Sequence, residues 1–248
     1  MKLGQKAMEA LKSEVTGFLN EGDELVAAGS IALMGTALIV QKEKEFLKQF
    51  FSEGFLWDAE RGNQLYSAYE IEALTDVLRD ACWEEISETW ISRIKETPVW
   101  KELKGMGAKA LYPLNSGGIL AGIWKMAEVS DVGLHVDLRK IPVRQETIEI
   151  CERFDLNPYK LFSGGSLLIG TGKGEAMVRF FQEKGIPSAI VGSVDKGNDR
   201  LLYSKGITRY LERPSQDELT RFSWGEKWKS SGRQPGRKEE TKEETKEC

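Results

Sequence analysis

Residues 107–138, GAKALYPLNSGGILAGIWKMAEVSDVGLHVDL, hold the pattern from which a fold class can be predicted. ALYPL (110–114) predicts a short strand, and SGGILAGIWKMAEVSD (116–131) predicts a helix entered through two glycines. LHVDL (134–138) alternates apolar and polar residues, as a half-buried strand does. Together the three segments predict a β-α-β unit.

Strand and helix signals continue to alternate on both sides of this unit. Upstream, ELVAAGSIAL (24–33) indicates a buried strand that turns sharply, followed by a helix to about Phe51. Downstream, the pattern predicts a helix over 143–154, a strand within FSGGSLLIG (162–170), a helix over 174–185, a strand over 186–194 and a hairpin of DRLLYS and ITRYL (199–211). The predicted fold is an α/β (α+β) domain with α/β/α layers and a mixed sheet.

The chain divides into three parts on these patterns. An amphipathic helix is predicted within 1–20, because apolar residues recur every three or four positions from Leu3 to Leu19. The domain is predicted to span 21–222, and its segment 58–100 reads as an α-helical insertion. Four tryptophans between Phe55 and Trp100 are interpreted as packing residues: Trp57, Trp83, Trp90 and Trp100. Residues 223–248 are rich in Gly, Ser, Lys and Glu, which predicts a disordered tail.

Composition excludes several classes of function. With 40% hydrophobic residues in 248, the chain can bury a real core. The 39 acidic and 35 basic residues leave a net charge of −4, which disfavours nucleic-acid binding. No apolar run approaches the roughly 20 residues that cross a bilayer, and the first residues do not resemble a signal peptide. We therefore expect no membrane association and a cytoplasmic location.

Metal and thiol chemistry are also disfavoured. Three separated cysteines and one histidine, His135, cannot form the usual zinc sites. His135 is expected to face away from the core, and Cys151 is expected to be an inert core thiol. Glu84, Glu85 and Glu88 lie within about one helical turn and are interpreted as a solvated helix face rather than a metal site.

Two glycine-bearing loops are the best candidates for ligand binding. The first begins a helix, where unpaired amides and the helix dipole favour an anion and glycine lets a phosphate approach. Glycine pairs at helix starts also serve as ordinary turn and packing devices. The candidate phosphate or nucleotide residues are Asn115, Ser116, Gly117, Gly118, Ser163, Gly164, Gly165 and Ser166. IGTGKGE (169–175) is rejected as a phosphate loop because it lacks the GxxxxGK[ST] spacing.

The order of these motifs resembles a known superfamily. EGDELVAAGSIALMGTALIV (21–40), SGGILAGIWKMAE (116–128), the long block 132–169 and GIPSAIVGSV (185–194) are similar to the C-terminal domain of the aminoimidazole ribonucleotide (AIR) synthetase, or PurM-like, superfamily. The similarity is greatest to its AIR synthase-related and hydrogenase maturation factor branch. It covers 21–53 and about 105–222.

The resemblance also implies what this chain lacks. In the superfamily an N-terminal domain supplies most of the ATP and metal ligands and the dimer interface, whereas only about 20 residues precede Gly22 here. The family's acidic position before the glycine pair falls in the uncharged stretch 112–116, and Met34 stands where relatives often have an acidic residue. Since Mg²⁺ requires hard anionic oxygens, we expect no metal site, no catalytic residues and no cofactor beyond a phosphate or nucleotide.

Three functional hypotheses follow. The first is a partner-dependent binding or maturation-factor-like module with a degenerate nucleotide or phosphate site, not active alone. The second is an ATP-dependent, hydrogenase-maturation-type enzyme whose ATP-binding half is a separate chain. The third is a structural module with vestigial loops. Because this domain type normally rests against an N-terminal half, we expect a protein partner or homo-oligomerisation.

The final residue bears on the second hypothesis. Hydrogenase maturation factors of this type end in a cysteine that carries a carbamoyl-derived group, and this chain ends in Cys248. The family's Pro-Arg-Ile-Cys ending is replaced by Thr245-Lys246-Glu247-Cys248, and neighbouring carboxylates disfavour a thiolate. We therefore expect Cys248 not to be a catalytic acceptor.

Overall fold

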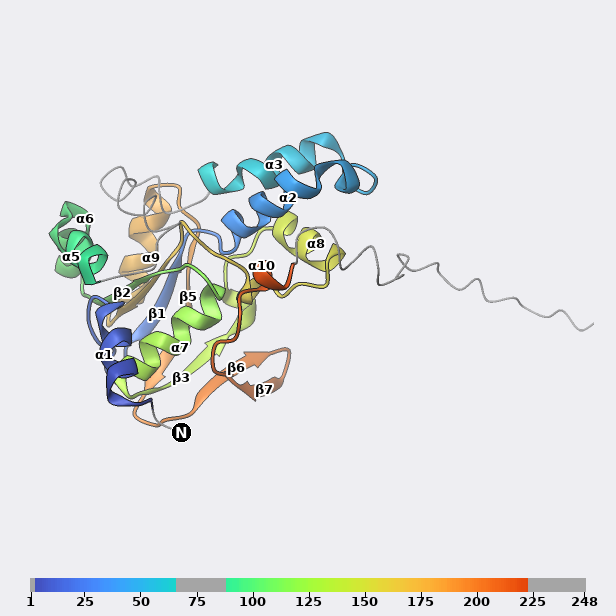
Figure 1. Cartoon of the computed structure of the whole chain (residues 1–248). Coiled ribbons are helices and arrows are strands. Elements are labelled where there is room, and N and C mark those ends of the chain that lie inside the picture. The colour runs from blue at the N-terminus through green and yellow to red at the C-terminus, as the bar shows by residue number, and fades with distance from the viewer. Residues whose placement is uncertain (1–2, 66–87, 223–248) are drawn as a thin grey trace, which may run out of the picture.

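The computed structural model describes residues 3–65 and 88–222 (Figure 1). The predictions made for Trp83, Glu84, Glu85, the tail 223–248 and Cys248 lie outside these residues, as do those for the side chains of Glu88 and Trp90.

A seven-stranded mixed sheet forms the centre of the described fold. Its strands are β1 (Glu24–Ala28), β2 (Ala108–Pro113), β3 (Gly133–Asp137), β4 (Leu167–Thr171), β5 (Ser188–Asp195), β6 (Arg200–Ser204) and β7 (Ile207–Tyr210). They lie in the order β2-β4-β1-β5-β3-β6-β7. Neighbouring strands are antiparallel except β3 and β6, which are parallel. The mixed sheet predicted from the sequence is confirmed.

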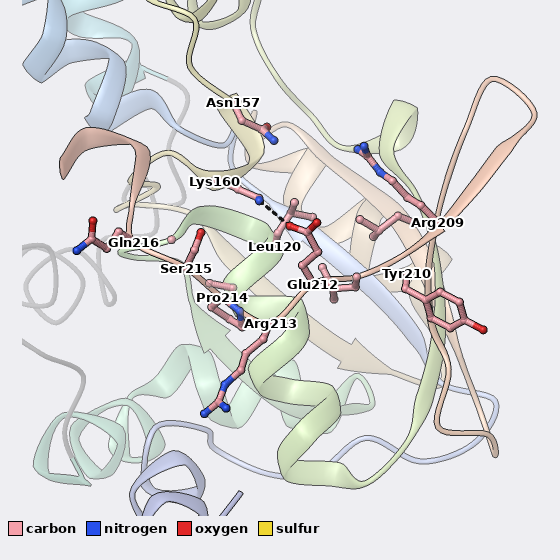
Figure 2. Close-up of a pocket in the computed structure, with 14 residues that line it drawn as sticks. Leu120, Asn157, Lys160, Arg209, Tyr210, Glu212, Arg213, Pro214, Ser215 and Gln216 are labelled. Atoms are coloured by element: carbon pink, nitrogen blue, oxygen red, sulfur yellow. Dashed lines mark hydrogen bonds and ion pairs between the residues drawn. The ribbon is translucent and has the colours of Figure 1, made fainter. Parts of the chain in front are cut away.

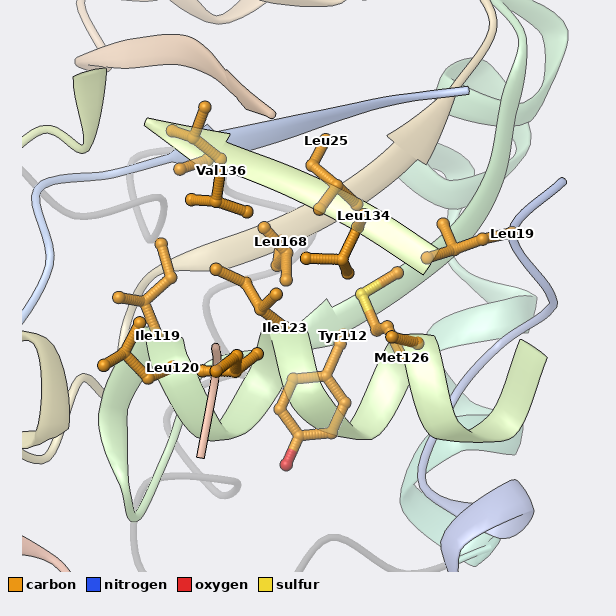
Figure 3. Packing of buried hydrophobic residues seen from close by; sticks show 14 of the residues in the cluster. Leu19, Leu25, Tyr112, Ile119, Leu120, Ile123, Met126, Leu134, Val136 and Leu168 are labelled. Atoms are coloured by element: carbon orange, nitrogen blue, oxygen red, sulfur yellow. The ribbon is translucent and has the colours of Figure 1, made fainter. Parts of the chain in front are cut away.

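Helices cover both faces of the sheet because its central strands are apolar on both sides. Leu25 and Ala27 of β1 contact one cluster, whereas Val26 and Ala28 contact the other. The first cluster is covered by α1 (Gln5–Ser13) and α7 (Gly118–Ser130). Figure 3 shows apolar side chains of α7 against the strands. The second is covered by α5 (Glu88–Glu96), α6 (Pro98–Gly105) and α9 (Gly174–Glu183). This is the predicted α/β/α arrangement.

A third apolar cluster lies at one end of the sheet. It is built from α2 (Leu33–Leu47), α3 (Glu53–Leu65) and α8 (Gln145–Arg153), which lie together in Figure 1. The short helix α10 (Glu218–Arg221) packs against it through Leu219 and Phe222. Two 3-10 turns, η2 (Leu138–Lys140) and η3 (Pro158–Lys160), flank α8 in the chain.

The predicted β-α-β unit is not a pair of neighbouring strands. β2 and β3 run in the same direction, but β4, β1 and β5 lie between them. The helix α7 therefore crosses over three strands. Local periodicity identifies each element but carries no information on which distant strands insert between them.

The N-terminal helix is shorter than the predicted 3–19 stripe. α1 ends at Ser13, and the following segment runs beside the edge strand β2. There Thr16 N donates to Leu111 O at 3.3 Å, and Leu111 N donates to the Thr16 hydroxyl at 2.8 Å. Phe18, assigned to the apolar stripe, is 54% exposed. Pairing with the open sheet edge gives hydrogen-bond partners to backbone groups of β2 that a longer helix would have left unpaired.

The interpretation of the tryptophans as packing residues is right for Trp100 and wrong for Trp57. Trp100 is buried against the second face of the sheet. Trp57 is 49% exposed, with the Arg61 guanidinium 5.0 Å from its ring centroid. On α3, the buried face belongs to smaller neighbours such as Leu56 and Ala59.

Cys151 is a core thiol, as its sequence position predicted. It is 1% exposed in the third cluster, and burial, reinforced by the charge of Glu218, raises its thiol pKa to about 12. Since the thiolate is the reactive form, Cys151 should resist a thiol reagent such as 5,5′-dithiobis(2-nitrobenzoic acid) at pH 8. In a Cys82→Ser/Cys248→Ser chain we expect no labelling when folded and one thiol in urea. Rapid labelling of the folded chain would contradict this assignment.

Candidate functional site

The two glycine-bearing loops singled out in the sequence meet at the start of α7. Ser163 N donates to Asn115 O at 3.3 Å, and Leu114 N donates to Ser166 O at 2.8 Å. Gly117 and Gly118 have φ values of +79° and +63°, so the turn into α7 uses a backbone conformation that favours glycine. The structure therefore brings the eight predicted residues together at one end of the sheet.

Most polar groups of these loops are occupied within the protein. The buried Ser163 hydroxyl accepts from Ala32 N at 2.9 Å and donates to Leu161 O at 2.8 Å. The buried Ser166 hydroxyl donates to Ser30 O at 2.9 Å. These two serines connect the loop to the segment between β1 and α2, which is a structural role.

The decisive residue at this site is Asp217, which the sequence analysis missed. Its carboxylate, 5% exposed, accepts from Gly117 N through Oδ2 at 2.5 Å. Its Oδ1 accepts from Phe162 N at 3.2 Å and from Leu219 N at 2.7 Å. Asp217 is also the N-cap of α10, and that capping pattern is the one sequence signal that could have drawn attention to it.

An internal anion thus occupies the position predicted for a bound one. Burial raises the pKa of Asp217, the three amides of Gly117, Leu219 and Phe162 oppose that rise, and Glu218 adds to it. The carboxylate lies at the positive end of the α7 dipole, where it receives the amide that a phosphate would need. A phosphate could bind these amides only by displacing Asp217.

The segment 211–217, here called the strap, carries Asp217 to this position. It leaves β7, passes the start of α7 and enters α10 (Figure 1). Between the strap, α7, η3 and β7 lies a pocket of about 190 Å³, here called the strap pocket. Gly117 contributes to its wall, and Figure 2 shows Lys160, Arg209 and Glu212 at its mouth.

The other residues considered in the sequence analysis lie outside this site. His135 is 57% exposed, as expected from its outward position in β3, and its Nε2 lies 2.7 Å from a carboxylate oxygen of Asp195. In the rejected 169–175 stretch, Gly174 N at the start of α9 donates to a carboxylate oxygen of Glu24 at 2.9 Å. Within 3–65 and 88–222, no group of three or more His, Cys, Asp or Glu is placed to hold a metal ion. No helix in the same residues is long and apolar enough to cross a membrane.

The sequence profile of one protein family covers more than half of the chain. Residues 60–203 match AIR synthase related protein, C-terminal domain. The chain belongs to this family. The resemblance stated from the sequence motifs is therefore confirmed. The family match begins inside 58–100, so it includes most of the segment predicted as an insertion.

Solved structures of hydrogenase maturation proteins share the family's fold. Escherichia coli HypE aligns at 19% identity and a TM-score of 0.55, covering 82% of this chain and 53% of HypE. A HypE–HypF complex gives 18% identity, a TM-score of 0.54 and coverages of 80% and 55%. HypE in complex with ATP aligns at 17% identity and a TM-score of 0.52, covering 82% of this chain and 54% of HypE. The chain spans about half the length of these proteins, and no curated protein matches it by sequence.

Proposed function

We propose that this chain is a cytoplasmic, partner-dependent module of the maturation-factor type whose nucleotide or phosphate site is degenerate. The observation that carries the proposal is the buried Asp217 carboxylate, which accepts from the amides of Gly117 and Phe162. A protein that bound phosphate at the start of α7 would need those amides free.

Electrostatics supports the degenerate site. A phosphate group brings one to two negative charges, and a carboxylate already buried at the same place repels it. Displacing Asp217 would also break three hydrogen bonds and detach the start of α10. ATP binding in this position would therefore require a rearranged strap.

Two observations support a protein partner. A protein of this fold has been solved as a HypE–HypF complex. Large apolar side chains are also exposed at two places, Phe50 and Trp57 near the α2–α3 end, and Ile207 and Tyr210 on β7. Such residues are common at interfaces.

The second candidate is an ATP-dependent enzyme that assembles with a separate ATP-binding chain. It is favoured by one comparison, the structure of HypE with ATP, which shares the fold over most of this chain. In that case the isolated chain would again lack activity, but the assembled complex would turn over ATP.

The test combines nucleotide binding with partner capture. We expect 1 mM Mg-ATP to leave the melting temperature of the isolated chain unchanged, and we expect no ATP hydrolysis. A native pull-down followed by light scattering should recover a defined complex. An ATP-dependent rise in melting temperature would contradict the degenerate site. ATP turnover by the recovered complex would establish the second candidate, whereas a monomer without partners would argue against both.

A further inference from the structure

The strap pocket has features of a binding site that the function proposed above does not use. Its floor is formed by the side chains of Leu120, Leu202 and Leu211, each less than 10% exposed. Charged groups from three separate elements stand around its mouth: Lys160 from η3, Arg209 from β7 and Glu212 from the strap (Figure 2). An apolar floor with a few polar groups at the rim is typical of small-molecule sites.

The charges at the mouth favour an anion. Lys160 Nζ lies 3.1 Å from a carboxylate oxygen of Glu212. Within 3–65 and 88–222, the guanidinium of Arg209 makes no hydrogen bond or ion pair. Among these residues only Lys160 pairs with the Glu212 carboxylate, and that carboxylate is held loosely, since the Glu212 side chain is 79% exposed. An exposed pair of this kind is worth little and can be exchanged for a ligand.

Asn157 adds a neutral hydrogen-bonding group on the same rim. Its Oδ1 accepts from Tyr159 N at 3.0 Å, which fixes the side chain and leaves the amide nitrogen as the donor toward a ligand. Arg213 also contributes to the wall, but its guanidinium points away from the pocket and lies 5.8 Å from the Trp124 ring centroid (Figure 2). The anion-binding groups are thus Lys160, Arg209 and Asn157.

Size limits the ligand. Pockets for drug-sized ligands enclose about 300–1,000 Å³, whereas this pocket encloses about 190 Å³. A complete nucleotide does not fit. A compact apolar body of the size of a phenyl ring, with one anionic group directed to the mouth, fits both the floor and the rim.

We propose that the strap pocket binds a small organic anion, in which one phosphate or carboxylate group is attached to a compact apolar body. Lys160 and Arg209 hold the anionic group, the leucine floor receives the apolar body, and Glu212 is the internal group that the ligand displaces. The pocket adjoins the Asp217 position, since Gly117 contributes to its wall, but Lys160, Arg209 and the leucine floor are distinct from the amides that Asp217 occupies, so the proposed binding does not require those amides.

The direct test uses phenyl phosphate and benzoate as probes of the two anionic groups. Two control compounds each carry one of the two required features: inorganic phosphate has the anionic group without the apolar body, and benzyl alcohol has the apolar body without the anionic group. Isothermal titration of the full chain should give a Kd on the order of 1 mM for at least one complete probe, with inorganic phosphate and benzyl alcohol each at least about tenfold weaker. Equal binding of inorganic phosphate and phenyl phosphate would overturn the proposed ligand class.

Variants assign binding to the pocket. Lys160→Met and Arg209→Met should each raise the Kd of the tighter-binding probe by about tenfold, because each removes a charge-assisted hydrogen bond. Glu212→Gln should tighten it by about two- to fivefold, because the competing carboxylate is removed. A gain of affinity cannot result from unfolding, so it keeps the test interpretable.

A matched pair elsewhere on the surface supplies the control. Lys48 and Glu45 form an ion pair of 2.7 Å with similar exposure to that of Lys160 and Glu212. Lys48→Met and Glu45→Gln change the net charge identically but should leave the Kd unchanged. Equal effects of both pairs, or no effect of the Lys160 and Arg209 variants, would show nonspecific attraction and refute the site. Neither result bears on the expectation that the isolated chain does not bind ATP, so failure of this site and failure of the proposed function can be told apart.

Discussion

Replacing Asp217 by alanine is expected to lower the free energy of unfolding by about 3 kcal/mol, since three amides, two of them buried, lose a charged acceptor. Urea denaturation followed by circular dichroism measures the loss. Asp137→Ala is the matched control, because Asp137 also caps a short turn and, within the described residues, accepts hydrogen bonds from Arg139 alone. The control variant should lose less unfolding free energy than Asp217→Ala. Equal losses would mean that Asp217 acts as an ordinary cap.

The same residue should give a recognisable pH dependence. Its pKa in the folded chain is raised from an ordinary value near 3.8 by burial, so the folded state retains the proton longer than the unfolded state. Stability from this group is therefore present below about pH 3.8 and falls as pH rises through the raised pKa. The difference in unfolding free energy between wild type and Asp217→Asn should decrease over that window and then level off. An increase would indicate that the amide hydrogen bonds outweigh burial.

Removing the carboxylate should also reopen the anion position. In Asp217→Gly the amide of Gly117 loses its internal acceptor. Inorganic phosphate should then raise the melting temperature more in this variant than in wild type, compared with chloride at equal ionic strength. Equal shifts in the two proteins would argue against a vestigial phosphate position at the start of α7.

Gly118→Ala is expected to cost at least about 3 kcal/mol of unfolding free energy. Gly118 has a φ of +63°, and an added Cβ would lie 2.5 Å from Tyr159 O and 2.8 Å from Leu161 O. Both are backbone atoms and cannot move aside as a flexible side chain can. The loss would therefore combine backbone strain with a collision against η3.

A second glycine separates these two effects. Gly185, just after α9, has a φ of +74°, but an added Cβ there meets nothing within 4 Å. Gly185→Ala should cost only the strain, about 1 kcal/mol. Urea titrations of both variants give the comparison, and similar losses would contradict the predicted collision. Since Gly118 holds the fold together, its substitution cannot report on phosphate binding alone.

Much of the fold was predictable because short-range patterns determine it. Alternation in LHVDL placed β3, and the Lys205–Gly206 turn placed the hairpin of β6 and β7. Strand order was not predictable, because β1 pairs with β4 and β5 from distant parts of the chain. The α1 helix was overextended for the same reason, since the edge of β2 competes for residues near Thr16.

The candidate site was predictable only in part. Gly117 and Gly118 marked the start of α7 through turn chemistry, which is local. Asp217 lies 100 positions away from Gly117, and Asp217-Glu218-Leu219 looks like an ordinary helix cap. The strap pocket likewise combines Lys160, Arg209 and Glu212 from three elements, and no spacing in the sequence associates them.

The central position of β1 has a consequence for how the protein is made. β1 leaves the ribosome before both of its partners, because Ala28 pairs with Leu167, which is synthesised 139 residues later, and with Ser188 after that. At translation rates of about 5–20 residues per second, this strand waits roughly 10–30 s for its partners. During that time Leu25 and Val26, fully buried in the finished sheet, are exposed to water and to other nascent chains. Chaperone binding to the nascent segment around β1 would protect the strand until β4 and β5 pair with it.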